Sequence, residues 1–262
     1  HGDFIMVGGY TLYFTVPILL HSMGLPAWTS VIAAIVICAL VGVLVELVAY
    51  RPVRRKGTSM SALITAIAMS LLLENLAQAI PAMGPNPRVI SDEIFSTAPM
   101  SLGGVSVNMA AVITIVIAAV VMAALQIFVQ KTKLGRAMRA VSENKEASTL
   151  VGINVNRTIV TTFAIGSGLA AVAALMYCAQ YHTVTTTMGS MLGLKAFVAA
   201  VMGGIGLIPG AMLGGIVVGI IEALVTAYIS SSLANAVVFL ILIVMLLVKP
   251  AGILGKNVGE KV

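Results

Sequence analysis

Long apolar runs constrain this sequence more than any other feature. A helix needs roughly 20 residues to cross about 30 Å of hydrocarbon, and six runs approach or exceed that length. They lie at Phe4–Leu20, Ala27–Val48, Met60–Ile80, Met109–Val129, Ile159–Tyr181 and Ala234–Val248. None shows the two-residue alternation of a barrel strand, and open sheets leave backbone groups unpaired in lipid. The sequence therefore predicts an all-α, polytopic transmembrane helical bundle.

The composition excludes most other classes of protein. Of the 262 residues, 60% are hydrophobic and only 9% are charged, whereas soluble domains have about 25% charged residues. So few charges cannot cover a soluble surface, which excludes soluble enzymes, secreted disulfide scaffolds and nucleic-acid binders. Cys38 and Cys178 lie inside apolar runs and are expected to be packed thiols. We expect one transmembrane domain, 1–262, in contact with membrane lipid, with a further segment preceding His1.

The basic residues predict how the chain is oriented in the membrane. Thirteen of the fifteen Lys and Arg residues fall in three groups, at 51–56, at 131–157 and after residue 248. Cytoplasmic loops of membrane proteins are enriched in Lys and Arg, so these segments, including the C-terminus, are expected in the cytoplasm. The net charge of +6 is then a topology signal, and nucleic acid is not expected as a partner.

If this orientation holds, both ends of the stretch Leu194–Tyr228 must lie on the outer side of the membrane. The run before it starts in the cytoplasm and ends outside, and the run after it must start outside to end in the cytoplasm. The stretch has 35 residues, too many for one span and few for two. Its middle contains Gly203, Gly204, Gly206, Pro209 and Gly210, and glycine with proline interrupts helices. We therefore predict a broken or re-entrant pair of shortened helices near residues 194–228, at about Lys195–Met202 and Ala211–Ala227. Broken backbone at membrane depth must be buried in protein or line a wet cavity.

Glycines spaced by four residues follow this break, at Gly206, Gly210 and Gly214. Small residues at this spacing let helix backbones approach closely. Packing within the chain or against a second membrane chain is the favoured interpretation, and a direct role in lining a path through the membrane is the other.

Signatures of catalysis and of metal binding are absent from the sequence. It contains no HExxH or GxSxG motif, and no GxxxxGK[ST] loop for ATP. The three histidines, His1, His21 and His182, are far apart in the sequence. We expect neither an enzyme nor a cofactor-binding chain.

The basic segment 131–157 contains a short candidate helix, Lys145–Val151. Asn144 is a suitable N-cap for this helix, and Gly152 stands where a helix often ends in a left-handed residue. Two turns of helix are marginal in water, so docking on a partner is one explanation for it. An ordinary surface helix between spans is the other.

These residues also carry a resemblance. Glu146, Ala147 and Ser148, followed after three residues by Gly152, resemble the EAA–x3–G coupling motif of ABC importer permeases, although Ala is commoner where Ser148 stands. The stretches HGDFIMVGGY, RAVSENKEASTLVGINVNR and GLKAFVAAVMGGIGLIPGAMLGGIVVGIIEAL resemble the branched-chain amino acid permeases, specifically the H-type member of a two-permease pair.

The resemblance implies a set of partners and a division of labour. A second permease would complete the path, an extracytoplasmic binding protein would supply substrate, and two cytoplasmic subunits would bind ATP. Segment 131–157 would couple the two ATP-binding subunits to the membrane helices, through Asn144, Glu146, Ala147, Ser148 and Gly152. Import of branched-chain or related amino acids across a bacterial inner membrane is implied. Urea, amides or another amino acid remain alternative substrates with the same architecture.

Five ionisable residues lie within or at the edge of apolar runs, where a charge needs a compensating partner or a function. They are Asp3, Glu46, Glu74, Lys195 and Glu222. Glu46 is expected to pair with the Arg51–Lys56 cluster, and Lys195 to extend toward the outer interface.

The other three acids keep two interpretations each. Asp3 either caps or pairs helices, or serves transport. Glu74 and Asn75 belong to a polar stripe that faces the path or joins helices. Glu222 is expected to hydrogen-bond another helix, with substrate contact as the alternative. If these acids bound protons or cations, the chain would be an ion-coupled secondary transporter, which is the rival from another class.

Overall fold

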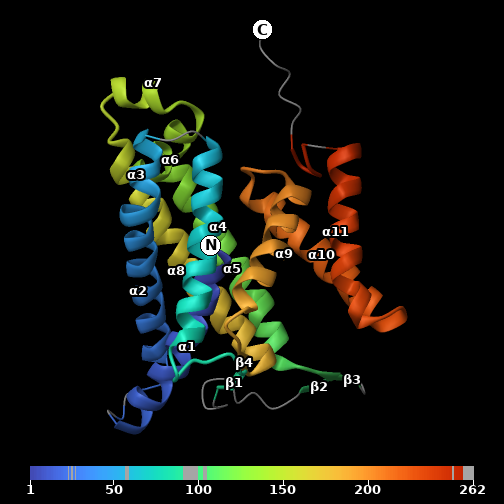
Figure 1. Ribbon diagram of the computed structural model, residues 1–262. Coiled ribbons are helices and arrows are strands. Elements are labelled where there is room, and N and C mark those ends of the chain that lie inside the picture. Colours follow the sequence, from blue (N-terminus) through green and yellow to red (C-terminus); the bar gives the residue numbers. More distant parts are fainter. Residues whose placement is uncertain are drawn as a thin grey trace. The chain divides into compact units, whose positions relative to one another are not determined.

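The computed structural model describes residues 1–22, 24, 26, 28–56, 59–90, 100–102, 105–249 and 251–255. Helices dominate these residues (Figure 1). The α-helices are α1 (Gly2–Pro17), α2 (Trp28–Val45), α3 (Arg51–Lys56), α4 (Ser59–Ala79), α5 (Met109–Lys131), α6 (Lys133–Glu143), α7 (Lys145–Leu150), α8 (Val155–Tyr181), α9 (Met188–Gly203), α10 (Ile208–Tyr228) and α11 (Ser231–Val248).

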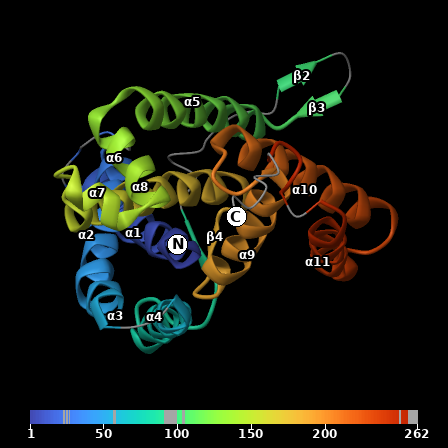
Figure 2. The ribbon, with the colours of Figure 1, turned by 90° about the horizontal axis from the view of Figure 1, so that it is seen from above.

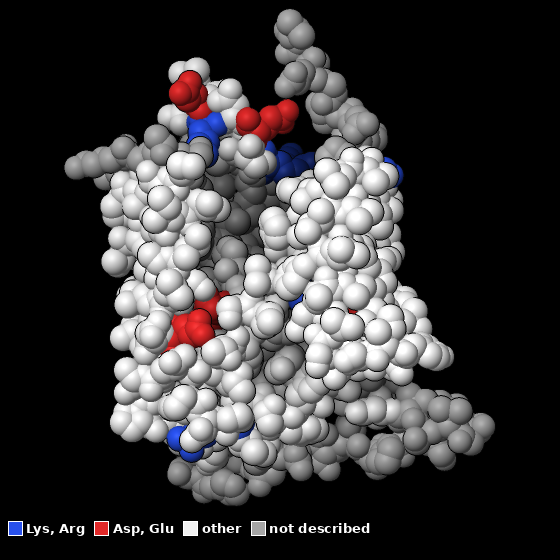
Figure 3. Space-filling view, turned by 45° about the vertical axis from the view of Figure 1, so that its right-hand side comes forward, with Lys and Arg blue, Asp and Glu red and all other residues white. Residues whose placement is uncertain are grey.

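Seven helical segments in the described part of the chain are long and apolar enough to cross a membrane. They contain α1, α2, α4, α5, α8, α10 and α11, whereas α9 is a shorter apolar helix of 16 residues. On the face shown in Figure 3, side chains of Lys, Arg, Asp and Glu are few among a mostly uncharged surface. The prediction of an all-α polytopic bundle is confirmed. Lys256 and Lys261, which were expected in the cytoplasm, lie outside the described residues.

The chain divides into two compact units, which we describe separately. The first unit comprises His1–Ala118 and Val129–Met191, and the second comprises Ala119–Phe128 and Leu192–Val262. Helix α5 and helix α9 each contribute residues to both units.

Small residues allow α1, α2 and α8 to pack closely at the centre of the first unit (Figure 2). A Cβ atom added to Gly8 of α1 would lie 3.0 Å from both the Cα atom of Ala171 and the Cβ atom of Ala174 in α8. A Cβ atom on Gly42 of α2 would overlap the hydroxyl of Ser167. Such close helix approach is how helices associate in lipid, where the hydrophobic effect does not drive them together.

Two π-helical segments continue the first two long helices. Segment η1 (Ile18–Ser22) follows α1, and η2 (Glu46–Tyr50) joins α2 to α3. A π-helical turn makes i→i+5 hydrogen bonds and shifts the side chains that follow it around the helix axis. In η2 this shift falls between Glu46 and Arg54.

Short strands connect the loops at one end of the first unit. Strand β1 (Arg88–Val89) pairs antiparallel with β4 (Thr183–Val184), and β2 (Met100–Leu102) pairs with β3 (Val105–Val107). The β1–β4 pair joins the loop after α4 to the loop after α8. In Figure 1 this pair lies at the opposite end of the unit from α6 and α7. The predicted orientation likewise puts those two loops on one side and segment 131–157 on the other.

The second unit contains the predicted break, between α9 and α10. Gly204 and Gly206 have φ angles of +111° and +90°, which disfavour residues with a Cβ atom. Gly203 and Gly210 face each other so closely that a Cβ atom on Gly203 would overlap the Gly210 carbonyl. Gly214 likewise approaches the carbonyl oxygen of Ala199. Gly203, Gly210 and Gly214 are therefore packing positions, whereas Gly206 lies in the turn.

The helices on each side of this break are longer than predicted. Helix α9 begins at Met188, not at Lys195, and α10 has 21 residues and is not shortened. Pro209 occupies the first turn of α10, where a residue without an N–H group costs no helical hydrogen bond. The proline therefore starts the second helix and does not delay it.

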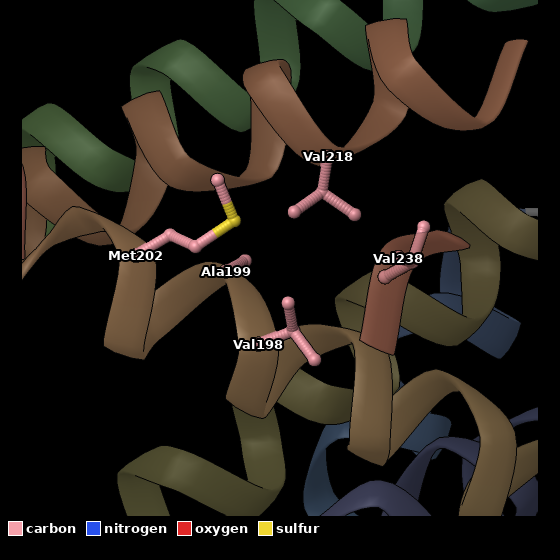
Figure 4. Close-up of a cluster of buried hydrophobic side chains, with 5 residues drawn as sticks. All are labelled: Val198, Ala199, Met202, Val218 and Val238. Atoms are coloured by element: carbon pink, nitrogen blue, oxygen red, sulfur yellow. The ribbon is translucent and has the colours of Figure 1, made fainter. Parts of the chain in front are cut away.

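Two further contacts hold the second unit together. Buried side chains from α9, α10 and α11 converge in one apolar cluster, which consists of Val198, Ala199, Met202, Val218 and Val238 (Figure 4). The segment 251–255, after α11, returns to the end of α9. There the backbone N–H groups of Ile253 and Leu254 donate to the carbonyl oxygens of Met202 and Gly203, at 2.7 and 3.2 Å. These bonds satisfy carbonyls that a helix end leaves without partners.

Candidate coupling segment and intramembrane polar side chains

Segment 131–157 folds as two short helices followed by the start of α8, with a polar side chain capping each helix. The side-chain oxygens of Thr132, Asn144 and Asn154 accept hydrogen bonds from the backbone N–H groups of Gly135, Ala147 and Arg157, each at 3.0 Å. Each bond satisfies one N–H group that the first turn of a helix leaves unpaired. The predicted cap at Asn144 is confirmed, and the same residue also ends α6.

The end of α7 is fixed by a Schellman motif. Gly152 has a φ angle of +87°, its N–H donates to Thr149, and the N–H of Ile153 donates to Ser148, both at 3.0 Å. These are the two hydrogen bonds that define this motif. The helix ends at Leu150, one residue before the predicted end. All five residues of the predicted coupling set thus lie in or beside one helix that is capped at both ends.

Helix α7 exposes apolar side chains on a loop that carries basic residues. Leu150 is 89% exposed and Val151 82% exposed, whereas Ser148 is buried. The hydroxyl of Ser148 donates to the Asn144 carbonyl at 2.7 Å, so the polar group faces the protein and the apolar groups face outward. An open groove of about 360 Å³ lies between α6 and α7. Neighbouring apolar side chains this exposed are typical of a protein contact surface.

Arg54 connects this segment to the end of α2. Its Nη1 atom lies 2.8 Å from Oε1 of Glu46, and its Nη2 atom donates to Oδ1 of Asn156 in α8 at 3.2 Å. The Glu46 side chain is fully buried. The expected pairing of Glu46 with the Arg51–Lys56 cluster is therefore confirmed. The contact with Asn156 was not predicted, because 102 residues separate it from Arg54.

Asp3 lies near the start of α1, where its helix approaches α9 in the first unit. Only 8% of the residue is exposed, and its Oδ1 atom has no hydrogen-bond partner among the described residues. A Cβ atom on Gly189 would lie 2.7 Å from the Cα atom of Asp3. Asp3 also lines a small cavity together with Phe4, Tyr50 and Phe163. Its role in capping, pairing or transport stays a prediction.

The Glu74 and Asn75 side chains lie on α4, whose membrane-crossing portion is largely exposed. The side-chain amide of Asn75 donates to the carbonyl oxygen of Leu71 at 2.7 Å. This bond stays within the helix, so Asn75 is exposed without leaving its amide unpaired. The choice between a path-lining stripe and a helix contact stays open.

Glu222 of α10 forms an ion pair with Lys195 of α9. The Nζ atom of Lys195 lies 2.6 Å from Oε1 of Glu222, and the two side chains are 24% and 34% exposed. The expectation that Lys195 extends to the outer interface is wrong, because its ammonium group turns toward Glu222. The pair was missed because 27 residues separate its members and the break between them removes any simple helical register.

No group of three or more His, Cys, Asp or Glu side chains in the described part of the chain could hold a metal ion. The two cysteines are free and buried.

Comparison with known proteins identifies the family. Residues 1–248 match the family model described as the branched-chain amino acid transport system permease component. The chain is 38% identical to the high-affinity branched-chain amino acid transport system permease protein BraD of Pseudomonas aeruginosa, with all of this chain and 87% of BraD covered. It is 41% identical to the corresponding LivH proteins of Salmonella typhimurium and Escherichia coli, with all of this chain and 86% of each relative covered.

No solved structure matches the chain significantly. The family match and the full-length relatives agree with the seven candidate spans, so the chain is part of a multi-pass membrane protein. It belongs to the family of branched-chain amino acid transport system permease components.

Proposed function

We propose that this chain is a permease subunit of an ATP-driven importer for branched-chain or related amino acids in a bacterial inner membrane. The relatives that cover the whole chain are named as permeases for branched-chain amino acids. The scarcity of charged residues in the spans suits a path that relies on an external binding protein for selectivity.

The structure of helix α7 is the main support for the proposed coupling to ATP-binding subunits. It is only six residues long, yet it is capped at both ends, and Leu150 at its end and Val151 directly after it are almost completely exposed. A helix this short is marginal in water, and exposed apolar side chains at its tip favour docking. In our proposal it enters a cleft on a cytoplasmic ATP-binding subunit, whose closure on ATP moves the membrane helices.

The remaining parts of the assembly follow from this arrangement. A second permease forms the path with this chain, an extracytoplasmic binding protein delivers substrate, and two cytoplasmic subunits bind and hydrolyse ATP. This chain needs no cofactor of its own. The basic segments and the C-terminus face the cytoplasm in this scheme.

Two alternatives differ from this proposal, one in the substrate that is carried and the other in the energy source that drives uptake. Urea or amide import would use the same architecture with another binding protein. An ion-coupled transporter would use Asp3, Glu74 and Glu222 as proton or cation sites and would need no ATPase. The ion pair with Lys195 already neutralises Glu222, which weakens this second alternative.

The test is gentle-detergent purification of the natural protein from its host, followed by mass spectrometry of what co-purifies. Two ATP-binding subunits and a second permease would support the proposal, and radiolabelled leucine uptake that requires ATP would establish the substrate class. A chain that purifies alone and drives uptake in vesicles without ATP would refute the coupling role of α7.

A further inference from the structure

The ion pair between Lys195 and Glu222 lies well inside apolar helices. Lys195 is seven residues from the start of α9 at Met188, and Glu222 is six residues from the end of α10 at Tyr228. At 1.5 Å per residue, both are about 10 Å along the helix from these ends. Ionisable groups at such depth are expensive and usually serve a function.

These two residues are the only charged ones in the apolar helices of the second unit, at residues 119–128, 192–203, 208–228 and 231–248. Among residues 119–128 and 192–255, the sequence has one further charged residue, Lys249, which follows the last helix. Lys195 and Glu222 therefore depend on each other for charge compensation within this unit.

Contacts other than the ion pair also hold α9 against α10. The backbones already meet at Gly203 and Gly210, and again at Ala199 and Gly214. The apolar cluster of Val198, Ala199, Met202, Val218 and Val238 also packs these helices together (Figure 4). Val198 is three residues from Lys195 and Val218 is four residues from Glu222, so the cluster begins about one helical turn from the pair. An apolar pair would fill the same space without the cost of desolvating two charges.

The pair is also accessible. About a quarter of the Lys195 side chain and a third of the Glu222 side chain are exposed, whereas the neighbouring Val198 and Val218 are buried. A solute that reaches the surface of α9 and α10 can therefore contact both charged groups at once.

We infer that Lys195 and Glu222 form a transit site for the zwitterionic head group of an α-amino acid. This inference rests on the proposed function. The substrate carboxylate replaces Glu222 as the partner of the Lys195 ammonium, and the substrate ammonium replaces Lys195 as the partner of the Glu222 carboxylate. No covalent bond changes.

The exchange has a physical advantage inside a membrane. Every charge has an opposite partner before, during and after the substrate passes, so no isolated charge is left in a low-dielectric environment. The site also closes again by itself, because the two protein groups pair once the substrate leaves. A neutral substrate such as urea would gain nothing from two opposite charges.

The first experiment measures ATP-dependent uptake of radiolabelled leucine by the full complex in proteoliposomes with its binding protein. The test variant, Lys195→Met/Glu222→Met, keeps the approximate volume of both side chains and removes both charges. The swapped variant, Lys195→Glu/Glu222→Lys, keeps the two charges in exchanged positions. The matched control, Leu194→Met/Ile220→Met, changes two exposed neighbours of the pair.

We expect the Met/Met variant to assemble and to lose leucine uptake by roughly tenfold or more, since a charge pair to the substrate is lost. The swapped variant should recover much of the uptake, because it still matches a zwitterion. Wild-type uptake by the Met/Met variant would overturn the inference and leave the proposed function intact. A wild-type complex that imports no amino acid would overturn both.

A second measurement uses the wild-type complex purified without its binding protein and does not depend on how the variants fold. Leucine at high concentration should raise the unfolding temperature, since a ligand of the native state stabilises it. 3-Methylbutylamine lacks the carboxylate and 4-methylpentanoate lacks the ammonium, so neither should do so. Equal stabilisation by all three compounds, or none by leucine, would contradict a site for the zwitterion.

Discussion

The Nη1 atom of Arg54 lies 2.8 Å from a carboxylate oxygen of Glu46, whose side chain has no exposed surface. Neither carboxylate oxygen of Glu46 accepts a hydrogen bond from the described residues, so charge pairing with Arg54 is what compensates it. Through Asn156, the same arginine also contacts the first turn of α8, within the candidate coupling segment 131–157.

Replacing Arg54 with Met should destabilise the protein severely, by about 3–5 kcal/mol, because it leaves a buried carboxylate unpaired. The double variant Glu46→Leu/Arg54→Met should recover most of that loss. Thermal unfolding in detergent measures both effects. Arg136→Met serves as the control, since Arg136 is exposed. Equal destabilisation by the single and double variants would show that Arg54 acts mainly through Asn156.

Replacing Gly152 with Ala should impair coupling without removing the protein from the membrane. Its φ angle of +87° costs an L-residue about 1–2 kcal/mol, and the Schellman motif that ends α7 depends on it. We expect ATP-dependent uptake to fall several-fold at unchanged membrane abundance. Gly152→Asn should be milder, because Asn tolerates this conformation better than Ala. Unchanged uptake with Ala would mean that the shape of this turn does not matter for coupling.

The double variant Leu150→Ser/Val151→Ser should weaken binding of the ATP-binding subunits. Both side chains are more than four-fifths exposed in this chain, so their loss removes little internal packing. Burial of a Leu or Val at an interface is worth about 1.5–3 kcal/mol per side chain. Co-purification should therefore drop strongly, while the unfolding temperature of the chain alone should stay the same. Val89→Ser, at an exposed position in β1, is the control and should leave co-purification unchanged.

Gly214 and Gly219 form a matched pair for testing the packing of α10. A Cβ atom on Gly214 would overlap the Ala199 carbonyl oxygen, whereas one on Gly219 meets no atom within 4 Å. Gly214→Ala should therefore cost about 1–3 kcal/mol through displaced backbone. Gly219→Ala should be neutral or stabilise the helix by up to about 1 kcal/mol. Thermal unfolding compares them directly, and similar values for both would contradict the packing of α9 on α10.

Cysteine labelling tests the orientation of the chain. Cys38 and Cys178 are fully buried, so a membrane-impermeant maleimide should leave both unmodified in native membranes. Lys133→Cys, at an exposed position at the start of α6, should react only from the cytoplasmic side, and Val89→Cys only from the opposite side. Labelling of both new cysteines from the same side would refute the orientation that we infer from the basic residues.

The sequence predicts best those features that depend on neighbouring residues. The caps at Asn144 and Gly152 follow from local hydrogen-bonding rules, and the break follows from the glycines and Pro209. The early start of α9 was missed because Gly189 and Gly193 are typical of loops in soluble proteins. In a membrane protein, Gly189 instead lies in the first turn of a helix that passes very close to Asp3.

Contacts between distant residues could not be predicted in the same way. Lys195 with Glu222, and Arg54 with Asn156, meet only because helices pack in a particular register. Periodicity fixes which face of a helix is apolar, but not which charged residue on another helix will face it. The sequence identified Glu46 and Glu222 as charges in apolar runs that need partners or a function. It identified the partner of Glu46 only as a nearby basic cluster.

The return of residues 251–255 to the end of α9 also affects how the protein is made. The carbonyl oxygens of Met202 and Gly203 receive their hydrogen bonds from Ile253 and Leu254, about fifty residues later in the chain. A ribosome-bound chain that ends before α11 therefore has a hairpin of α9 and α10 with an unfinished turn. These bonds form only after residues 251–255 have followed α11 out of the ribosome, so a segment made later completes the turn between two helices made earlier.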